Sequence, residues 1–425
     1  MREEFLHFVW QQKLFPAGAL TTTAGEKVEV LHPGLPNDHD GPDFLEAQVK
    51  IGGVLWVGHV EIHLRSSDWY AHGHYHDPRY DQVVLHVVAQ QDDEVRRSNG
   101  ETVPQVILRW DAALLRNYEA LQRQRAWVPC SRDLHRVDPF VVKHWLGRVV
   151  VERLEQHAAA IRDDLEETAG DWEEVLYRHL ARGFGLQANA RPFYLTARSL
   201  PLKWLARHRD QLPQVEALLF GQAGLLDTEI FGDDYYERLK KEYHYLRQKF
   251  SLTPIEGHLW RQMRMRPSAF PAIRLAEFAR FIHQQENVFS RVIRTPDLKQ
   301  LEPLFRITLD GYWEDHYLFN KPSRKQKKSF GKQAFHLLLI NIVVPFYFIY
   351  GVVNDREEYR ERALEILEAL PPEKNAVIRR WETTGIRAES AFYSQALIRL
   401  KKDYCNKGRC LACGIGMKII TEKKS

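Results

Sequence analysis

The hydrophobic period of the sequence changes near residue 112, and this change constrains the fold more than any other feature. Before that point apolar and polar residues alternate, as in DFLEAQVKI (43–51), VLWVGHVEIHLR (54–65) and DQVVLHVVAQ (81–90). A period of two predicts β-strands, and Gly52-Gly53 between the first two segments predicts a hairpin turn. After residue 112 the apolar residues recur with the 3.6-residue period of an α-helix, starting with a helix opened by Asp138-Pro139.

These patterns predict two domains and a tail. A helix at 3–12, a strand at 25–31, the three segments above and a last strand at 102–110 form an α/β unit on a small mixed sheet. A chain of 425 residues is long enough for more than one core. We therefore expect an α/β domain over residues 1–112, a large α-helical domain over 113–400, and a cysteine-containing C-terminal tail over 401–425.

The sequence also predicts a cytoplasmic protein that does not enter a membrane. The apolar stretch 334–353 approaches the length of a membrane span, about 20 residues, but His336, Asn341 and Pro345 interrupt it. We expect a buried core helix there. The N-terminal MREEFLHFVW lacks the basic start and apolar core of an export signal. Four cysteines without a secreted-domain pattern suit a reducing compartment.

Acidic and imidazole side chains occupy the strand segments where a plain surface strand needs neither. Glu61 and His63 lie two residues apart, so they share one face of their strand at a separation of about 7 Å. Asp43 begins the preceding strand, and the hairpin brings it beside Glu61. Two carboxylates and a base at one end of a sheet are suitable ligands for Mg²⁺ or Mn²⁺. Such an ion polarises a phosphoryl oxygen and generates hydroxide.

Pro42-Asp43, seventeen residues and then Glu61-Ile62-His63, in an α-β-β-β-α-β order, resemble the core of the PD-(D/E)XK nucleases. The resemblance implies a restriction-endonuclease-like fold in which Asp43 and Glu61 bind the metal ion, often helped by the carbonyl of Ile62. It also implies an acid on the first helix, for which Glu4 is the better of two candidates. His63 stands where these nucleases have the lysine that orients or activates the water.

A longer signature is more specific. GPDF, VEIHLRSSDW, HxHxxDxxY and VVLHVV resemble an uncharacterised bacterial family of unknown function, along the whole chain. This resemblance implies no activity.

A second group of residues leaves another possibility open. The HGHYH segment and a later strand carry four histidines, and imidazole suits Zn²⁺ or Fe²⁺. They are surface or structural residues, phosphate contacts, or ligands of a histidine-centred metalloenzyme that acts on a small molecule. These histidines are His72, His74, His76 and His86.

Three of the four cysteines lie together near the C-terminus. Cys405, Cys410 and Cys413 have the spacing C-x4-C-x2-C, and Cys130 is the only other cysteine. Four thiolates hold either structural zinc or an iron–sulfur cluster. The alternative is four reduced cysteines without a metal ion. Some PD-(D/E)XK nucleases are similar in that one upstream and three C-terminal cysteines hold a 4Fe–4S cluster, with another spacing.

Two basic segments are candidate contacts for phosphate groups, namely KPSRKQKKSFGKQ (321–333) and RQMRMRPSAFPAIR (261–274). We therefore expect a metal-dependent nuclease that hydrolyses nucleic acid, probably DNA. Glu61, Asp43 and Glu4 would bind the ion, and His63 would position or deprotonate the water. The rivals are a catalytically inactive nucleic-acid-binding or scaffold protein with the same fold, which the missing lysine favours, and the histidine-centred metalloenzyme.

Overall fold

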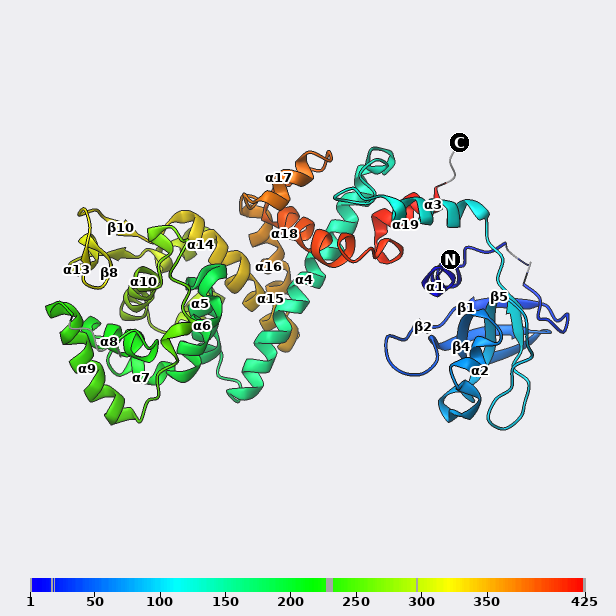
Figure 1. The fold of residues 1–425 in the computed structure, drawn as a ribbon, viewed down its shortest axis with the longest axis horizontal. Helices are drawn as coiled ribbons and strands as arrows, with labels where there is room; N and C mark the ends of the chain where they lie inside the picture. Colours follow the sequence, from blue (N-terminus) through cyan, green and yellow to red (C-terminus); the bar gives the residue numbers. More distant parts are fainter. Residues whose placement is uncertain (1, 17, 19, 227–231, 296, 423–425) are drawn as a thin grey trace. The chain divides into compact units, whose positions relative to one another are not determined.

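The computed structural model describes residues 2–16, 18, 20–226, 232–295 and 297–422 (Figure 1). The chain divides into two compact units. Unit 1 comprises Met1–Leu146, Arg380–Ile386 and Ile398–Ser425, and unit 2 comprises Gly147–Arg379 and Arg387–Leu397. The last strand of the N-terminal sheet ends at Ile107 and the first long helix after it begins at Ala112, where the hydrophobic period changes. The predicted domain limits at residues 112 and 400 stay a prediction.

A mixed sheet forms the N-terminal part of unit 1. Its strand order is β1-β3-β4-β5-β6, with the short β2 paired to β3. The β1–β3 and β3–β4 pairs are antiparallel, whereas the β4–β5 and β5–β6 pairs are parallel. The strands are β1 (Val28–His32), β2 (Leu35–Pro36), β3 (Phe44–Ile51), β4 (Val54–Arg65), β5 (Val83–Gln90) and β6 (Gln105–Ile107). The predicted mixed sheet is confirmed; β2 was not predicted.

The turn between β3 and β4 explains their register. Gly52 and Gly53 have φ values of 58° and 89°, a left-handed conformation that glycine adopts without steric cost. This turn pairs Ile51 with Val54 and Phe44 with Val60. The hairpin therefore carries the start of β3 to the middle of β4, next to Glu61.

Both faces of the second half of β4 are covered. On β4, Val60, Glu61, Ile62 and His63 are all at most 4% exposed. Helix α1 (Glu3–Gln11) packs against β4 through an apolar face that includes Phe5. The acids and imidazoles of β4 therefore lie inside unit 1 and do not form the solvated face of an ordinary surface strand.

The crossover from β4 to β5 is anchored by an aromatic cluster. The crossover contains α2 (Asp68–Ala71) and the one-turn 3₁₀ helices η1 (His74–His76) and η2 (Pro78–Tyr80). Trp69 is fully buried against Tyr80, Val83, Val95 and Val103, and its indole nitrogen donates to the Arg96 carbonyl at 3.0 Å. These contacts hold the histidine-bearing loop against the sheet.

The rest of unit 1 is helical. Helix α3 packs against α19, and the η9 turn contacts both α1 and α3. Asn117 donates to the Ile420 carbonyl at 3.1 Å. The elements are α3 (Ala112–Arg123), η3 (Leu134–Arg136), the first turns of α4 (Pro139–Glu167), the π-helical segment η8 (Leu400–Cys405), η9 (Cys410–Ala412) and α19 (Gly414–Thr421).

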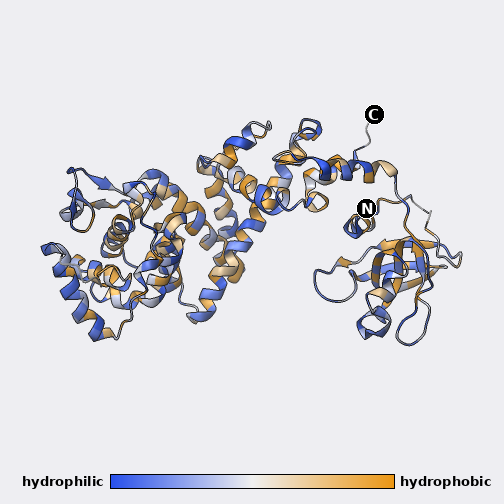
Figure 2. Ribbon diagram, viewed as in Figure 1, coloured by the Kyte–Doolittle hydropathy of each residue, from blue (hydrophilic) through white to orange (hydrophobic). Residues whose placement is uncertain are grey.

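Unit 2 is almost entirely helical, as predicted for this region. Its helices carry hydrophilic and hydrophobic residues in alternation (Figure 2), the amphipathic pattern of helices around a core. They are the rest of α4, α5 (Trp172–Phe184), α6 (Leu186–Ser199), α7 (Leu202–Ala206), α8 (Leu212–Gln222), α9 (Asp234–Phe250), α10 (Pro271–Gln284), α11 (Val288–Arg294), α12 (Leu298–Leu301), α13 (Tyr312–Asp315), α14 (Lys332–Leu338), α15 (Val344–Val353), α16 (Glu357–Ala369), and most of α17 (Ala376–Glu382) and α18 (Ala391–Arg399).

The non-helical parts of unit 2 are small. They comprise the turns η4 (Gly257–Leu259), η5 (Pro267–Ala269) and η6 (Glu302–Phe305), and two two-stranded sheets formed by β7 (Thr308–Leu309) with β10 (Lys328–Ser329) and by β8 (His316–Leu318) with β9 (Lys321–Pro322).

The apolar stretch near residue 340 forms a continuous helical segment. Among the described residues one helix, Lys332–Val353, has the length and composition of a membrane span, and 67% of its most apolar window is buried inside the structure. The middle of this segment is a π-helical turn, η7 (Leu339–Val343). Arg153 of α4 donates to the Asn341 side chain at 3.3 Å. Tyr347 donates to the Thr295 carbonyl at 2.9 Å. In unit 2 this segment is packed as a core helix.

Gly58 of β4 sets the approach of β5 to the acid-bearing part of the sheet. A Cβ atom there would lie 2.6 Å from the Gln82 carbonyl oxygen and 2.4 Å from a Val84 methyl group. We expect Gly58→Ala to lower the free energy of unfolding by about 1–3 kcal/mol, because the backbone must shift to relieve the clash. Urea denaturation measures this change. Gly331→Ala is the control, since a Cβ there meets nothing within 4 Å; equal losses in both variants would contradict the argument.

Candidate metal centre

The side chains of Asp43 and Glu61 each accept a hydrogen bond from a backbone N–H group of the other's chain segment. Glu61 accepts a hydrogen bond from the Asp43 backbone N–H through Oε2 at 3.0 Å. Asp43 accepts one from the Ile62 N–H through Oδ2 at 2.9 Å. The β3–β4 register shifts between Phe44 and Ala47, where Glu46 has a φ of 55°. Such a bulge re-aims side chains near its strand. The structure thus brings together the two acids that the sequence predicted to meet.

Helix α1 adds two more ligand-type side chains. Glu3 and His7 are four residues apart and so share one face of the helix. Their ligand atoms and that of Asp43 all lie within 4.8 Å of one another. The His7 Nε2 atom is 3.4 Å from Asp43 Oδ2. We call Glu3, His7, Asp43 and the adjoining Glu61 the carboxylate group.

Glu4 does not belong to this group. Its carboxylate accepts a hydrogen bond from the Tyr118 hydroxyl of α3 at 2.5 Å and lies 3.6 Å from Arg2. The acid that α1 presents to Asp43 is therefore Glu3, and the choice of Glu4 is corrected. Glu3 lies on the face of α1 that is turned toward Asp43, and Glu4 does not. The sequence signal that could have identified Glu3 is its four-residue spacing from His7.

A second group of ligands lies on the other side of Glu61. The His63 Nε2 atom is 3.1 Å from His72 Nδ1 and 3.4 Å from Glu61 Oε1. The His74 Nε2 atom is 3.2 Å from the same Glu61 oxygen. The ligand atoms of His63, His72 and His74 all lie within 4.8 Å of one another. We call these three residues the histidine group.

Of the other two predicted histidines, His86 is buried and His76 is exposed. His86 of β5 is buried, and its Nε2 atom lies 2.8 Å from His63 Nδ1. His76 is exposed and its ring packs on Tyr75. His63 itself is 1% exposed and has both ring nitrogens within hydrogen-bonding distance of other imidazoles. No ring nitrogen of His63 is free for a water molecule, which argues against its expected role as the base.

In the absence of a cation, the electrostatics of the centre favour the neutral forms of Glu61, Glu3, His63 and His86. For His7, burial lowers the pKa, but the contact with Asp43 outweighs burial and raises the pKa overall. Burial, and next the charge of Asp43, raise the pKa of Glu61 to about 9. Burial, and next the neighbouring imidazoles, lower the pKa of His63 to about 2, and burial lowers that of His86 to about 3. Burial and Asp43 also raise the pKa of Glu3. A divalent cation would reverse the cost of ionising these acids. Perturbed groups of this kind cluster at functional sites.

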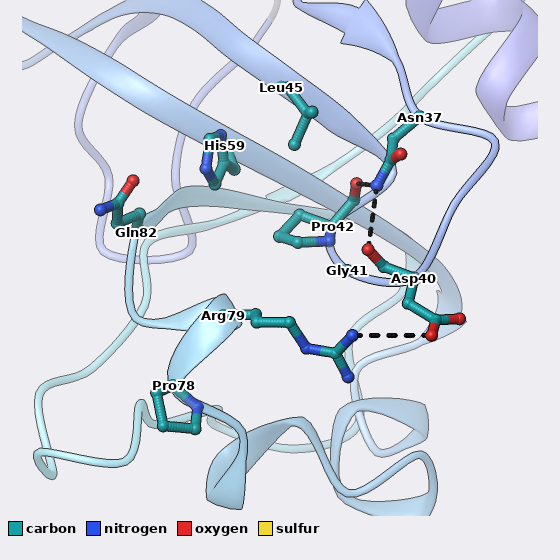
Figure 3. A pocket seen from close by; sticks show the side chains of 9 residues that line it. All are labelled: Asn37, Asp40, Gly41, Pro42, Leu45, His59, Pro78, Arg79 and Gln82. Atoms are coloured by element: carbon teal, nitrogen blue, oxygen red, sulfur yellow. Dashed lines mark hydrogen bonds and ion pairs between the residues drawn. The ribbon is translucent and has the colours of Figure 1, made fainter.

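An open hollow of about 340 Å³ adjoins the start of β3 (Figure 3). Pro42, which precedes Asp43, forms one side, and Pro78 and Arg79, which follow the histidine loop, form another. Arg79 is bound to Asp77 at 2.6 Å and lies 3.8 Å from Asp40. Asn37 holds the loop by donating to the Pro42 carbonyl at 3.0 Å.

All four cysteines line a single small cavity in unit 1, of about 20 Å³. Cys130 follows α3, Cys405 ends η8, Cys410 begins η9 and Cys413 precedes α19. Among the described residues, no three of the four sulfur atoms lie mutually within 4.8 Å. Burial, and next the other thiols, raise the pKa of Cys405 to about 12 and of Cys410 to about 11. A bound metal ion would favour the thiolates instead.

The two basic segments lie in unit 2, and each contributes some of its cations to internal contacts. Lys328 is buried and donates to the Glu314 and His316 carbonyls, both at 3.0 Å. Arg274 is buried and pairs with Glu277. The exposed cations of these segments are Lys321, Arg324, Lys325, Lys327, Lys332, Arg261, Arg264 and Arg266.

We expect Mn²⁺ to stabilise the metal-free protein, since an ion that binds only the folded state raises the free energy of unfolding. The gain is about 2.7 kcal/mol at a free concentration of 100 times Kd. Asp43→Asn should reduce this gain, whereas Asp38→Asn, an exposed acid outside the carboxylate group, should not. Urea denaturation with and without Mn²⁺ measures both; the same gain in Asp43→Asn as in the wild type would contradict the site.

Comparison with known proteins places the chain in a family without assigning an activity. A family model described as "Protein of unknown function (DUF2851)" matches residues 3–376. No curated protein matches the chain, and no solved structure matches it. The family match confirms the predicted membership of an uncharacterised family and says nothing of nucleases.

Proposed function

The chain belongs to the DUF2851 family, whose function is unknown, and we propose that it is a metal-dependent hydrolase of phosphodiester bonds in nucleic acid, with DNA as the first substrate to test. The observation that carries the proposal is the carboxylate group. It brings the ligand atoms of Glu3, His7 and Asp43 mutually within 4.8 Å, and Glu61 adjoins them because its side chain accepts the Asp43 N–H while Asp43 accepts the Ile62 N–H.

These residues have the chemistry of a site for Mg²⁺ or Mn²⁺. Three carboxylates and one imidazole suit a hard or borderline divalent ion. When bound, the ion polarises a phosphoryl oxygen and lowers the pKa of a bound water. Asp43 and Glu61 hold the ion in place because their own positions are set by the sheet. Glu3 and His7 complete the group from α1, and no lysine is needed to form hydroxide.

The order of the elements supports the nuclease-like reading. Helix α1, strands β1, β3 and β4, the short α2 and the parallel strand β5 follow one another as the PD-(D/E)XK resemblance implies. Asp43 directly precedes β3, and Glu61-Ile62-His63 lies in β4. The restriction-endonuclease-like fold is thus part of the proposal. The departure from the pattern is His63, which contacts other imidazoles where these nucleases have the lysine.

Exposed cations support a nucleic-acid substrate. Arg261, Arg264 and Arg266 of one segment, and Lys321 and Arg324 of the other, are exposed. Cations of this kind contact phosphate groups without regard to sequence, and their contribution falls with salt. We expect binding that weakens as the salt concentration rises.

Cleavage assays with matched variants test the proposed activity. We expect Mn²⁺-dependent cleavage of a labelled DNA, reduced at least about 100-fold in Glu61→Gln and Asp43→Asn, because a lost ligand removes transition-state charge stabilisation. Glu3→Gln should reduce the rate at least about 10-fold. Glu4→Gln is the matched control on the same helix and should retain activity. Single-stranded DNA, duplex DNA and RNA are compared as substrates.

Several outcomes would reject the proposal. Equal rates for the wild type and Glu61→Gln would assign cleavage to a contaminant. If the wild type binds DNA in a salt-sensitive manner and neither it nor any variant cleaves DNA, the result would favour a catalytically inactive nucleic-acid-binding or scaffold protein.

The histidine group favours a second candidate function, a metalloenzyme with a histidine-bound ion that acts on a small molecule. His63, His72 and His74 suit Zn²⁺ or Fe²⁺. The hollow of about 340 Å³ is lined by Pro42, Pro78 and Arg79 and by none of these three histidines, so the candidate rests on the histidine group alone. This candidate would be favoured by tightly bound zinc or iron together with the absence of nuclease activity.

We also propose that Cys130, Cys405, Cys410 and Cys413 hold a single metal centre. A tetrahedral zinc site with bonds of about 2.3 Å needs sulfur atoms about 3.8 Å apart. All four cysteines line one cavity of about 20 Å³, and the proposed centre is either a zinc ion or an iron–sulfur cluster. Such a centre would tie the segment after α3 to the C-terminal helices.

Spectroscopy and elemental analysis test the cysteine site. Protein purified without oxygen is expected to contain either zinc without colour, or iron and sulfide with a broad visible absorption band. Cys410→Ser should lose the metal and unfold at lower temperature, whereas Ser131→Ala, next to Cys130, should keep the metal and the stability of the wild type. One equivalent of zinc without colour would assign structural zinc, and four reduced thiols without metal would reject the site.

A further inference from the structure

We propose that His63, His72 and His74, together with the Oε1 atom of Glu61, form a second metal site for a zinc-like ion beside the carboxylate group, with Glu61 bridging the two ions. The binding site stands on its own geometry, and its part in catalysis rests on the proposed function. A two-ion centre of this kind clamps both the attacking and the leaving oxygen of a phosphodiester.

The conformation of the His72-Gly73-His74 segment explains how both of its histidines reach His63. Helix α2 ends before His72, and η1 begins at His74. Gly73 between them has a φ of 77°, which reverses the chain so that both imidazoles face His63. The His74 ring stacks on Tyr80 with centroids 3.8 Å apart, and the buried Trp69 makes an edge contact with it at a centroid distance of 5.4 Å. The loop is therefore held rigidly against the sheet.

Three distances between these ligand atoms agree with those around a tetrahedral ion. With bonds of about 2.0–2.1 Å, neighbouring ligand atoms are separated by about 3.3–3.4 Å. The distances are 3.1 Å from His63 Nε2 to His72 Nδ1, 3.4 Å from His63 Nε2 to Glu61 Oε1, and 3.2 Å from His74 Nε2 to Glu61 Oε1. The His74 Nε2 atom makes no hydrogen bond with Glu61.

Unpartnered nitrogen atoms point to a missing ligand. His74 is 8% exposed, and its Nε2 atom is buried without a hydrogen-bond partner. A buried polar atom left without a partner costs about 1–3 kcal/mol. A metal ion at this position accepts the lone pairs of all three imidazoles. The site is open on one side, because His72 is exposed.

His86 positions the ligand His63. With Nε2 of His63 directed at the ion, Nδ1 carries the proton and donates to His86 Nε2 at 2.8 Å. Metal-bound histidines regularly donate their second N–H in this way, which sets the ring orientation and the tautomer. The pairing of Glu61 with His86 across β4 and β5 keeps this arrangement in register.

Glu61 is the residue that joins the two sites. Its Oε2 atom accepts the Asp43 N–H at 3.0 Å, and its Oε1 atom faces His63 and His74. The two oxygens of one carboxylate therefore serve two groups of ligands.

Zinc binding by the full chain tests the inference. The protein is stripped with EDTA and titrated with Zn²⁺ by calorimetry, and bound zinc is counted by mass spectrometry. We expect His72→Ala,His74→Ala to bind one equivalent fewer than the wild type, and His86→Gln to bind that equivalent about 10- to 100-fold more weakly. His76→Ala, the exposed neighbour, should behave as the wild type, and the cysteines contribute equally to all four proteins.

The outcomes separate this inference from the proposed function. Equal zinc content in the wild type and His72→Ala,His74→Ala would overturn the histidine site, whatever the cleavage rates. Loss of one equivalent with no nuclease activity in any protein would support the site and reject the nuclease. His72→Gln provides a second test that spares the fold, because this side chain is exposed; it should weaken zinc binding while circular dichroism stays unchanged.

Discussion

The arrangement of the candidate centre depends on one reciprocal interaction between two strands. Glu61 of β4 accepts the Asp43 N–H, and Asp43 accepts the N–H of Ile62. Each carboxylate thereby satisfies a backbone group where the β3–β4 register is interrupted. The two acids are held together without any cation, and burial, and next the charge of Asp43, favour the neutral form of Glu61 by raising its pKa. The sheet thus places Asp43 next to His7 of α1, and Glu61 next to His74 of the histidine-bearing loop.

Burial determines the chemistry of this place. Glu61 and His63 are almost completely enclosed, and burial shifts the pKa of the acid upward and that of the imidazole downward. Neutral imidazole is the form that binds metal ions, and a cation offsets the cost of an ionised carboxylate in the interior. Exposed His72 leaves one side open to solvent. A buried centre with one open side is suited to an ion that exchanges a water molecule for a substrate oxygen.

Several features of the site followed from local sequence, and others did not. The Gly52-Gly53 turn and the alternation on either side predicted that Asp43 would meet Glu61, because a two-residue turn sets the register of the whole hairpin. The choice between Glu3 and Glu4 depended on which face of α1 lies on the sheet, and the contact of Glu4 with Tyr118 of α3 decides it. The sequence did not indicate that His86 and His72 lie within hydrogen-bonding distance of the two ring nitrogens of His63.

The sequence alone determined the change from a mixed sheet to helices, the family, the hairpin and the set of side chains able to bind a metal ion. These follow from hydrophobic period, turn residues and residue types, which act over a few neighbours along the chain. Tertiary structure alone decided that the acids and imidazoles are buried together around Glu61, and that Cys130 lines one cavity with the three C-terminal cysteines. Burial and the meeting of distant segments arise from packing between elements, which local pattern does not encode.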